Sequence, residues 1–215
     1  MVQKNKKSRD LKPEAASPRR RGRPRGYEPE IALGQALDLF RKGGFAATSL
    51  DDLSAATGMN RPSLYGAFGD KRELYIKSYA RYRADVRAAM IGIFRGELPI
   101  RERLKRIYAA ALDIYIADAS EPKGCFSVMT AASEAVADPE IRAMVLDGFA
   151  ELDKAFLSCF RRAKEAGELS ASADPVALAQ LASATIHTLA IRSRARVSRK
   201  ELEAIVTGAI GVMCG

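Results

Sequence analysis

Residues 49–68, SLDDLSAATGMNRPSLYGAF, carry two short helical patterns separated by a turn. Ser49 precedes the first pattern, and Asp52 three residues later completes a capping box that starts a helix. Gly58 supplies the permissive backbone that a tight turn needs. Asn60 then starts the second pattern as its N-cap. The stretch therefore predicts a helix-turn-helix unit.

The second helix of this unit is expected to bury Leu64 against the first, which leaves its opposite face exposed. That face carries Asn60, Arg61, Ser63 and Tyr65. These side chains are donors and acceptors of the kind that read base edges or grip phosphates in a major groove. Two short helices can also be mere connectors within a core, but a connector gains nothing from an exposed Arg and Tyr. We therefore expect a helix that reads double-stranded DNA.

A strongly basic segment precedes this unit. Residues 1–25 hold ten Lys or Arg against two acidic residues, so eight of the nine net positive charges of the chain lie there. Such a segment cannot bury enough apolar surface to fold alone, and we expect a disordered basic arm. Arg21, Arg23 and Arg25 on an extended backbone suit a narrow minor groove. The alternative is a tail that only improves solubility.

The composition of the whole chain favours packed helices. Apolar residues make up 47% of the 215 residues, aromatic residues only 7%, and Trp is absent, a balance unlike that of a β-sandwich. Helical periodicity recurs with no strand-like alternation, and the sequence predicts an all-α protein of about nine helices. The predicted helices lie at about 29–42, 49–56, 60–68, 70–95, 100–119, 125–137 and 138–167, with two more from 174 and from 198.

Several functional classes are disfavoured by the sequence. No stretch reaches the roughly 18 clean apolar residues of a membrane span, and the basic N-terminus does not lead into a signal peptide. We therefore expect a cytoplasmic protein that has no membrane partner. One histidine and three scattered cysteines predict no metal site. We expect no cofactor and no enzyme activity, since no nucleophile–base–acid arrangement and no Gly-rich phosphate loop is present. Cys125, which starts a predicted helix, is either a redox-sensitive thiol or, in the preferred interpretation, an ordinary buried cysteine.

Three segments, 36–40 (ALDLF), 43–58 (GGFAATSLDDLSAATG) and 63–74 (SLYGAFGDKREL), carry a family resemblance. Together they resemble the N-terminal domain of the TetR/AcrR family of bacterial transcriptional regulators. The resemblance implies that residues 60–68 form the recognition helix, that Tyr65 and Lys71 contact phosphate, and that Thr48 braces the backbone before the second helix. In the family's usual string, the aromatic residue after the Leu-Tyr pair is followed by a second aromatic residue or a histidine. This chain has Gly66-Ala67-Phe68 instead, and the small residues there allow the backbone to approach DNA more closely.

The same resemblance implies a division into three parts: the arm at 1–25, a helix-turn-helix domain at 26–72, and a ligand-binding and dimerisation domain at 73–215. A homodimer formed through the last two helices would read a palindromic operator. The implied function is repression that a small-molecule inducer relieves. The alternative is an architectural DNA-binding protein without a ligand.

Aromatic, Met and His side chains on inward stripes are the candidates for an inducer pocket, and they suit an apolar or aromatic molecule. Each of them, taken singly, is better explained as ordinary core. The candidates are Tyr79, Tyr82, Tyr108, Tyr115, Phe126, Met129, Met144, Phe149 and His187.

Overall fold

The computed structural model describes residues 28–117 and 121–215, and within these ranges it contains helices and no strands. The helices are α1 (Pro29–Ala47), α2 (Leu50–Thr57), α3 (Arg61–Phe68), α4 (Lys71–Arg95), α5 (Ile100–Tyr115), α6 (Phe126–Ala132), α7 (Glu134–Ala137), α8 (Pro139–Glu165), α9 (Pro175–Arg194) and α10 (Arg199–Cys214). The all-α prediction is confirmed. Arg21, Arg23 and Arg25 lie outside the described residues, so their role stays a prediction.

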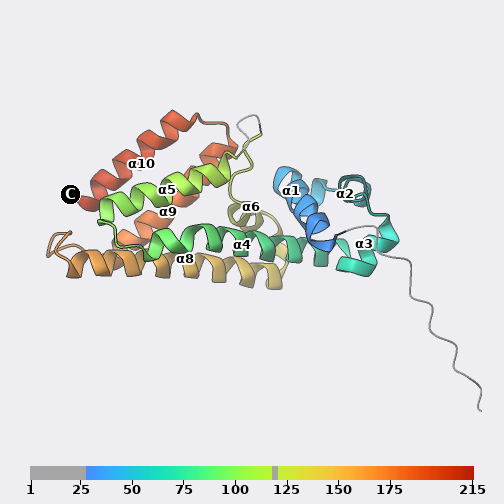
Figure 1. Cartoon of the computed structure of the whole chain (residues 1–215), viewed down its shortest axis with the longest axis horizontal. Coiled ribbons are helices and arrows are strands. Elements are labelled where there is room, and N and C mark those ends of the chain that lie inside the picture. The colour runs from blue at the N-terminus through green and yellow to red at the C-terminus, as the bar shows by residue number, and fades with distance from the viewer. Residues whose placement is uncertain (1–27, 118–120) are drawn as a thin grey trace, which may run out of the picture.

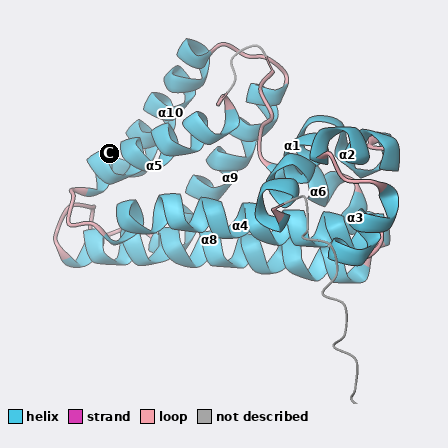
Figure 2. Ribbon diagram, turned by 45° about the vertical axis from the view of Figure 1, so that its right-hand side comes forward, coloured by secondary structure: helices cyan, strands magenta, loops and turns pink. Residues whose placement is uncertain are grey.

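The molecule is elongated, with α1, α2 and α3 clustered at one end (Figure 1). Helix α4 runs from this cluster into the larger bundle of the other helices. Helix α8 lies beside α4 and runs in the same direction, since Arg72 pairs with Asp138 at one end and Arg162 donates to the Phe94 carbonyl at the other. Helices α5, α9 and α10 all lie on one side of the α4–α8 pair (Figure 2). Helix α4 is thus one continuous element shared by both parts of the molecule.

The predicted start signals of the helix-turn-helix are confirmed. The Ser49 hydroxyl accepts a bond from the amide of Asp52 at 3.1 Å, and the Asp52 carboxylate accepts one from the amide of Ser49 at 2.8 Å. The Asn60 side-chain oxygen accepts a bond from the amide of Ser63 at 2.9 Å. Gly58 ends α2 with a φ of 65°, in the left-handed region that glycine adopts without strain.

The described helices differ from the predicted ones at three places. Helix α5 ends at Tyr115, not near residue 119. Helix α1 extends to Ala47, although Gly44 does break its helical geometry, with a φ of 79° and a ψ of 177°. The continuation is stabilised because the Phe45 ring packs edge-on against Tyr75, with ring centres 5.3 Å apart. The single helix expected over 125–137 is divided into α6 and α7, since Ser133 departs from helical geometry (φ −124°, ψ −89°). The described residues therefore form ten helices.

Two buried clusters hold the molecule together. The first joins α1–α3 to the first half of α4, and Phe126 of α6 packs into it beside Tyr75. The second joins α5, α8, α9 and α10. The boundary expected between residues 72 and 73 falls within the first turn of α4, and the division into domains stays a prediction. None of the described helices combines the length and the apolar character needed to cross a membrane.

Candidate nucleic-acid interface and bundle cavity

Helix α3 buries one face and leaves the other open. Leu64 and Phe68 are buried against the neighbouring helices, whereas the Tyr65 side chain is 47% exposed. Gly66 is exposed, and a Cβ atom added there would meet nothing within 4 Å. The open face of α3 is therefore free to approach a large partner closely, with Tyr65 projecting from it.

Two of the predicted base-reading side chains already have partners within the protein. The Arg61 guanidinium donates to Oδ1 of Asp51 through Nη2 at 2.7 Å and through Nε at 3.1 Å. Sequence reasoning did not identify Asp51, which orients this guanidinium at the start of α3. The side-chain oxygen of Asn60 is occupied by its capping bond, which leaves its NH2 group as the remaining donor. Ser63 is half-buried.

Thr48 and Lys71 flank α3 in different environments. Thr48 is only 4% exposed, and its hydroxyl donates to the Gly44 carbonyl at 2.7 Å, which fixes the backbone immediately before α2. Lys71 is the first residue of α4, and its ammonium lies 4.3 Å from the centre of the Phe45 ring. This cation–π contact holds a positive charge in the first turn of α4, where free backbone amides also favour an anion.

An ion-pair anchor ties the start of α4 to the start of α8. Arg72 Nε lies 2.6 Å from Oδ2 of Asp138, and Arg72 Nη2 lies 2.7 Å from Glu140. The hydrogen bond from Arg72 is the largest cause that lowers the pKa of Asp138, to about 2. Asp138 also caps α8 by accepting bonds from the amides of Glu140 and Ile141.

This anchor predicts a pH-dependent stability difference. Asp138→Asn keeps a capping oxygen but removes the charge that pairs with Arg72, so we expect a lower melting temperature at neutral pH. A carboxyl whose folded pKa is depressed stabilises the protein above its unfolded pKa of 3.8 and loses that contribution as the pH falls toward about 2. Thermal unfolding followed by circular dichroism should show the two proteins converging below about pH 4. A difference that stayed constant across this range would contradict the ion-pair explanation.

A second junction connects the end of the α1 helix to the bundle. Arg41 donates to the carbonyls of Ile114 at 3.1 Å and Gly124 at 3.2 Å, and its guanidinium lies 5.1 Å from the centre of the Tyr82 ring. Arg194 of α9 donates to the Arg41 carbonyl at 3.0 Å. These contacts join residues far apart in the sequence, and sequence reasoning did not identify them.

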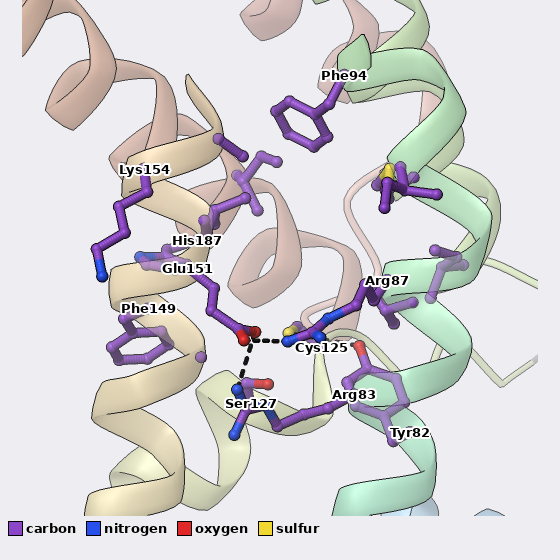
Figure 3. A pocket seen from close by; sticks show the side chains of 18 of the residues that line it. Tyr82, Arg83, Arg87, Phe94, Cys125, Ser127, Phe149, Glu151, Lys154 and His187 are labelled. Carbon is purple, nitrogen blue, oxygen red and sulfur yellow. Dashed lines mark hydrogen bonds and ion pairs between the residues drawn. The ribbon is translucent and has the colours of Figure 1, made fainter. Parts of the chain in front are cut away.

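A cavity of about 540 Å³ lies between α4 and α8 and is lined as well by residues of α5, α6 and α9 (Figure 3). Four of the nine candidate pocket residues line it: Tyr82, Tyr115, Phe149 and His187. The rings of Phe149 and His187 lie 4.7 Å apart. Burial lowers the pKa of His187 and a nearby Asp153 opposes this, so the imidazole is neutral at neutral pH.

The other five candidates are not among the residues that line the cavity: Tyr79, Tyr108, Phe126, Met129 and Met144. Tyr79 and Phe126 are fully buried and pack edge to face, with ring centres 5.6 Å apart. The Tyr108 hydroxyl donates to the Ala182 carbonyl at 3.2 Å within the second core. Met144 packs against the first core. The inward-facing side chains of the helices thus divide between the packed core and the lining of the cavity.

Charged residues also line the cavity, and sequence reasoning missed them. Glu151 of α8 reaches across to α4, where it pairs with Arg87 and, at 2.9 Å, with Arg83 (Figure 3). Arg83 pairs with Asp147 as well, at 2.7 Å. The spacing of Arg83 and Arg87, one helical turn apart, is the signal that places both on one face.

Cys125 is half-buried in the cavity wall, and its sulfur accepts a hydrogen bond from the Tyr82 hydroxyl at 3.5 Å. A redox role for this thiol stays a prediction.

Comparison with known proteins identifies the chain. The family model of "Bacterial regulatory proteins, tetR family" matches residues 32–77, and the model "Tetracyclin repressor-like, C-terminal domain" matches residues 101–209. The chain belongs to the TetR family of transcriptional regulators and is not an enzyme.

Named relatives fit this assignment. The HTH-type transcriptional repressor ComR of Escherichia coli K12 is 28% identical over 184 residues, which cover 85% of this chain and 87% of ComR. The uncharacterized HTH-type transcriptional regulator YezE of Bacillus subtilis 168 is 28% identical over 149 residues, or 69% of this chain and 76% of YezE. A cysteine mutant of the TetR-family regulator CifR, solved with 26-bp operator DNA, superposes with a TM-score of 0.78 at 28% identity, and the match covers 88% of this chain and 98% of that one.

Proposed function

We propose that this regulator is a dimeric repressor that binds a palindromic operator through α3 and is released by a small molecule bound in the cavity. The observation that carries the proposal is the continuity of α4. Its first residue, Lys71, follows the end of α3 after only Gly69 and Asp70, while Tyr82 and Met90 farther along the same helix line the cavity. The operator complex of the similar CifR supports the DNA-binding part.

The proposed release depends on differential binding. A ligand shifts the regulator only if it binds better to the geometry that does not fit DNA. A small tilt of α4 changes the position of α3, and in a dimer it changes the separation of two reading heads. Arg41 offers a second route, because it contacts Tyr82 in the cavity wall and belongs to α1.

The dimer is proposed to form through α9 and α10. These helices expose Leu181, Ile191 and Val212, which are 41%, 57% and 75% exposed in the single chain. Ala184 on α9 and Gly208 on α10 are also exposed, and small side chains there allow two subunits to approach closely. Two-fold pairing of this face would present two copies of α3 to the two halves of a palindrome.

Substitution on this face tests the dimer. Leu181→Arg places a charge at the proposed contact, and an unpaired charge is costly to bury. We expect the mass measured by light scattering to fall from twice the 23.3 kDa chain mass to that of one chain. Leu146→Arg, on an exposed position of α8, is the matched control and should leave the mass unchanged. Equal masses for both variants and the parent protein would exclude this interface.

Selection of bound duplexes from a random DNA pool, at physiological salt, tests the function itself. An inverted repeat with two half-sites is the expected product, because two symmetry-related α3 helices read it. Enrichment of A·T tracts alone would instead favour the architectural alternative, in which a basic arm in the minor groove dominates. Recovery of no preferred sequence would also contradict the proposal.

A further inference from the structure

The cavity has an unequal charge balance. Five of its lining residues are Lys or Arg and one is Glu. Its single histidine is neutral at neutral pH, because burial lowers its pKa. A cavity with this excess of positive charge favours an anionic occupant over a neutral or cationic one of the same shape.

Two of the unpaired positive charges lie toward one end of the cavity. Arg83 and Arg87 are balanced by Asp147 and Glu151, with which they pair. Three lining cations pair with no carboxylate among residues 28–117 and 121–215: Arg95, the last residue of α4, and Lys154 and Arg162 of α8. Arg95 and Arg162 lie near the ends of their helices, whereas Lys154 lies about two helical turns before Arg162.

Arg162 also retains free donors. Its Nη2 donates to the Phe94 carbonyl at 2.6 Å, and its other guanidinium donors have no oxygen acceptor in the described part of the chain. A guanidinium has five N–H donors in a planar fork that matches a carboxylate. The bond to Phe94 holds this fork at the cavity end where α4 terminates.

Most of the remaining lining is apolar, although Lys154, Ser158 and His187 also contribute to it. Met90, Phe94 and Leu152 lie along it, and Phe94 and Cys125 are well separated in the close-up view (Figure 3). The thirteen residues of α4 from Arg83 to Arg95 span twelve helical steps, a rise of about 18 Å. The cavity therefore suits a long, narrow apolar chain better than a compact ring system.

We propose that the cavity binds an elongated amphipathic carboxylate, with its head group held by Arg95 and Arg162 and its chain extending toward Tyr115 and Cys125. This inference rests on the proposed function in taking the cavity as the effector site, and it adds the chemical class of the effector. The two guanidinium groups provide selectivity for the head group, and burial of the chain provides most of the affinity.

Calorimetric titration of the full-length protein with matched twelve-carbon probes tests this class. Dodecanoate, dodecan-1-ol and dodecylamine are compared below the concentrations at which they aggregate. Dodecanoate should bind at least about tenfold more tightly than the alcohol, since it gains a charge-assisted hydrogen bond, and the amine should bind most weakly. Equal affinity for the acid and the alcohol, or preference for the amine, would overturn the proposal.

Variants locate the head group. Arg162→Gln and Arg95→Gln should each reduce dodecanoate affinity by about tenfold and leave the affinity for dodecan-1-ol unchanged. Arg161→Gln is the matched control, because Arg161 is the exposed neighbour on α8 and does not line the cavity. If Arg161→Gln reduced affinity as much as Arg162→Gln, a general charge effect would replace the proposed site.

The tail position has a separate readout. Bound dodecanoate should slow alkylation of Cys125, measured by peptide mass spectrometry, and leave that of Cys214 unchanged, since only Cys125 lines the cavity. Unchanged alkylation of Cys125 in the saturated protein would contradict the assigned orientation.

Titration of dodecanoate into the operator complex separates the proposed effector control from the proposed ligand class. Binding without DNA release contradicts effector control but keeps the ligand class, whereas release by the alcohol alone contradicts the class but keeps effector control.

Discussion

Tyr65→Ala is expected to weaken binding to every DNA duplex, whatever its sequence. The side chain projects from the open face of α3 and is assigned a phosphate contact. A hydrogen bond to a charged group contributes about 1.5–3 kcal/mol, and a dimer loses two of them. Since each 1.4 kcal/mol is tenfold in affinity, the loss should be on the order of a hundredfold or more. Fluorescence anisotropy with the selected operator and with a scrambled duplex measures both affinities.

Two comparisons make this result specific. Tyr65→Phe, which removes only the hydroxyl, should lose affinity for both duplexes to a smaller extent. Arg61→Ala should instead alter the preference between operator variants, because we propose that Arg61 reads base edges. Tyr65 is 47% exposed, so its truncation leaves the core intact. Normal operator binding by Tyr65→Ala would show that the phosphate assignment is wrong.

Phe126→Ala is expected to cause a large loss of stability. Phe126 is fully buried, and its ring centre lies 5.2, 5.6 and 5.7 Å from those of Tyr75, Tyr79 and Tyr82. Truncation leaves a cavity among three rings of α4, and removal of a buried Phe typically costs about 3–5 kcal/mol. Urea unfolding at fixed protein concentration measures the free energy of unfolding, and we expect the midpoint to fall accordingly.

The matched variants bracket this effect. Phe126→Leu retains most of the buried volume and should cost less than half as much. Val136→Ala, at a position that is 68% exposed on the neighbouring α7, should leave the free energy of unfolding nearly unchanged. A loss below about 0.5 kcal/mol for Phe126→Ala would mean that this cluster does not hold α6 to α4, since surface substitutions usually stay within about that range.

Local signals made most of the fold predictable. The capping box of Ser49 and Asp52, the Asn60 cap and the turn at Gly58 each involve residues close in sequence. The errors arose where distant contacts override local preference. Gly44 does break the helical geometry, as its terminating signal indicates, but a further helical segment that packs Phe45 on Tyr75 follows it.

The site was less predictable for a related reason. Helical periodicity shows which residues face inward, but it does not distinguish a packed core from a cavity. Tyr79 and Tyr82 share one inward stripe of α4, and only Tyr82 lines the cavity. Whether an inward-facing side chain of α4 packs against another ring or lines the cavity depends on the separation of α4 and α8. The Arg41–Arg194 junction likewise joins positions 153 residues apart, which no local pattern encodes.

The central claim is that this protein reads a specific DNA sequence. It is tested most directly by the ratio of dissociation constants for the selected operator and a scrambled duplex of equal length, measured at physiological salt. A sequence-reading regulator should prefer its operator by roughly 10³-fold or more. A ratio within about tenfold of unity would contradict the account and would indicate binding dominated by the phosphate backbone.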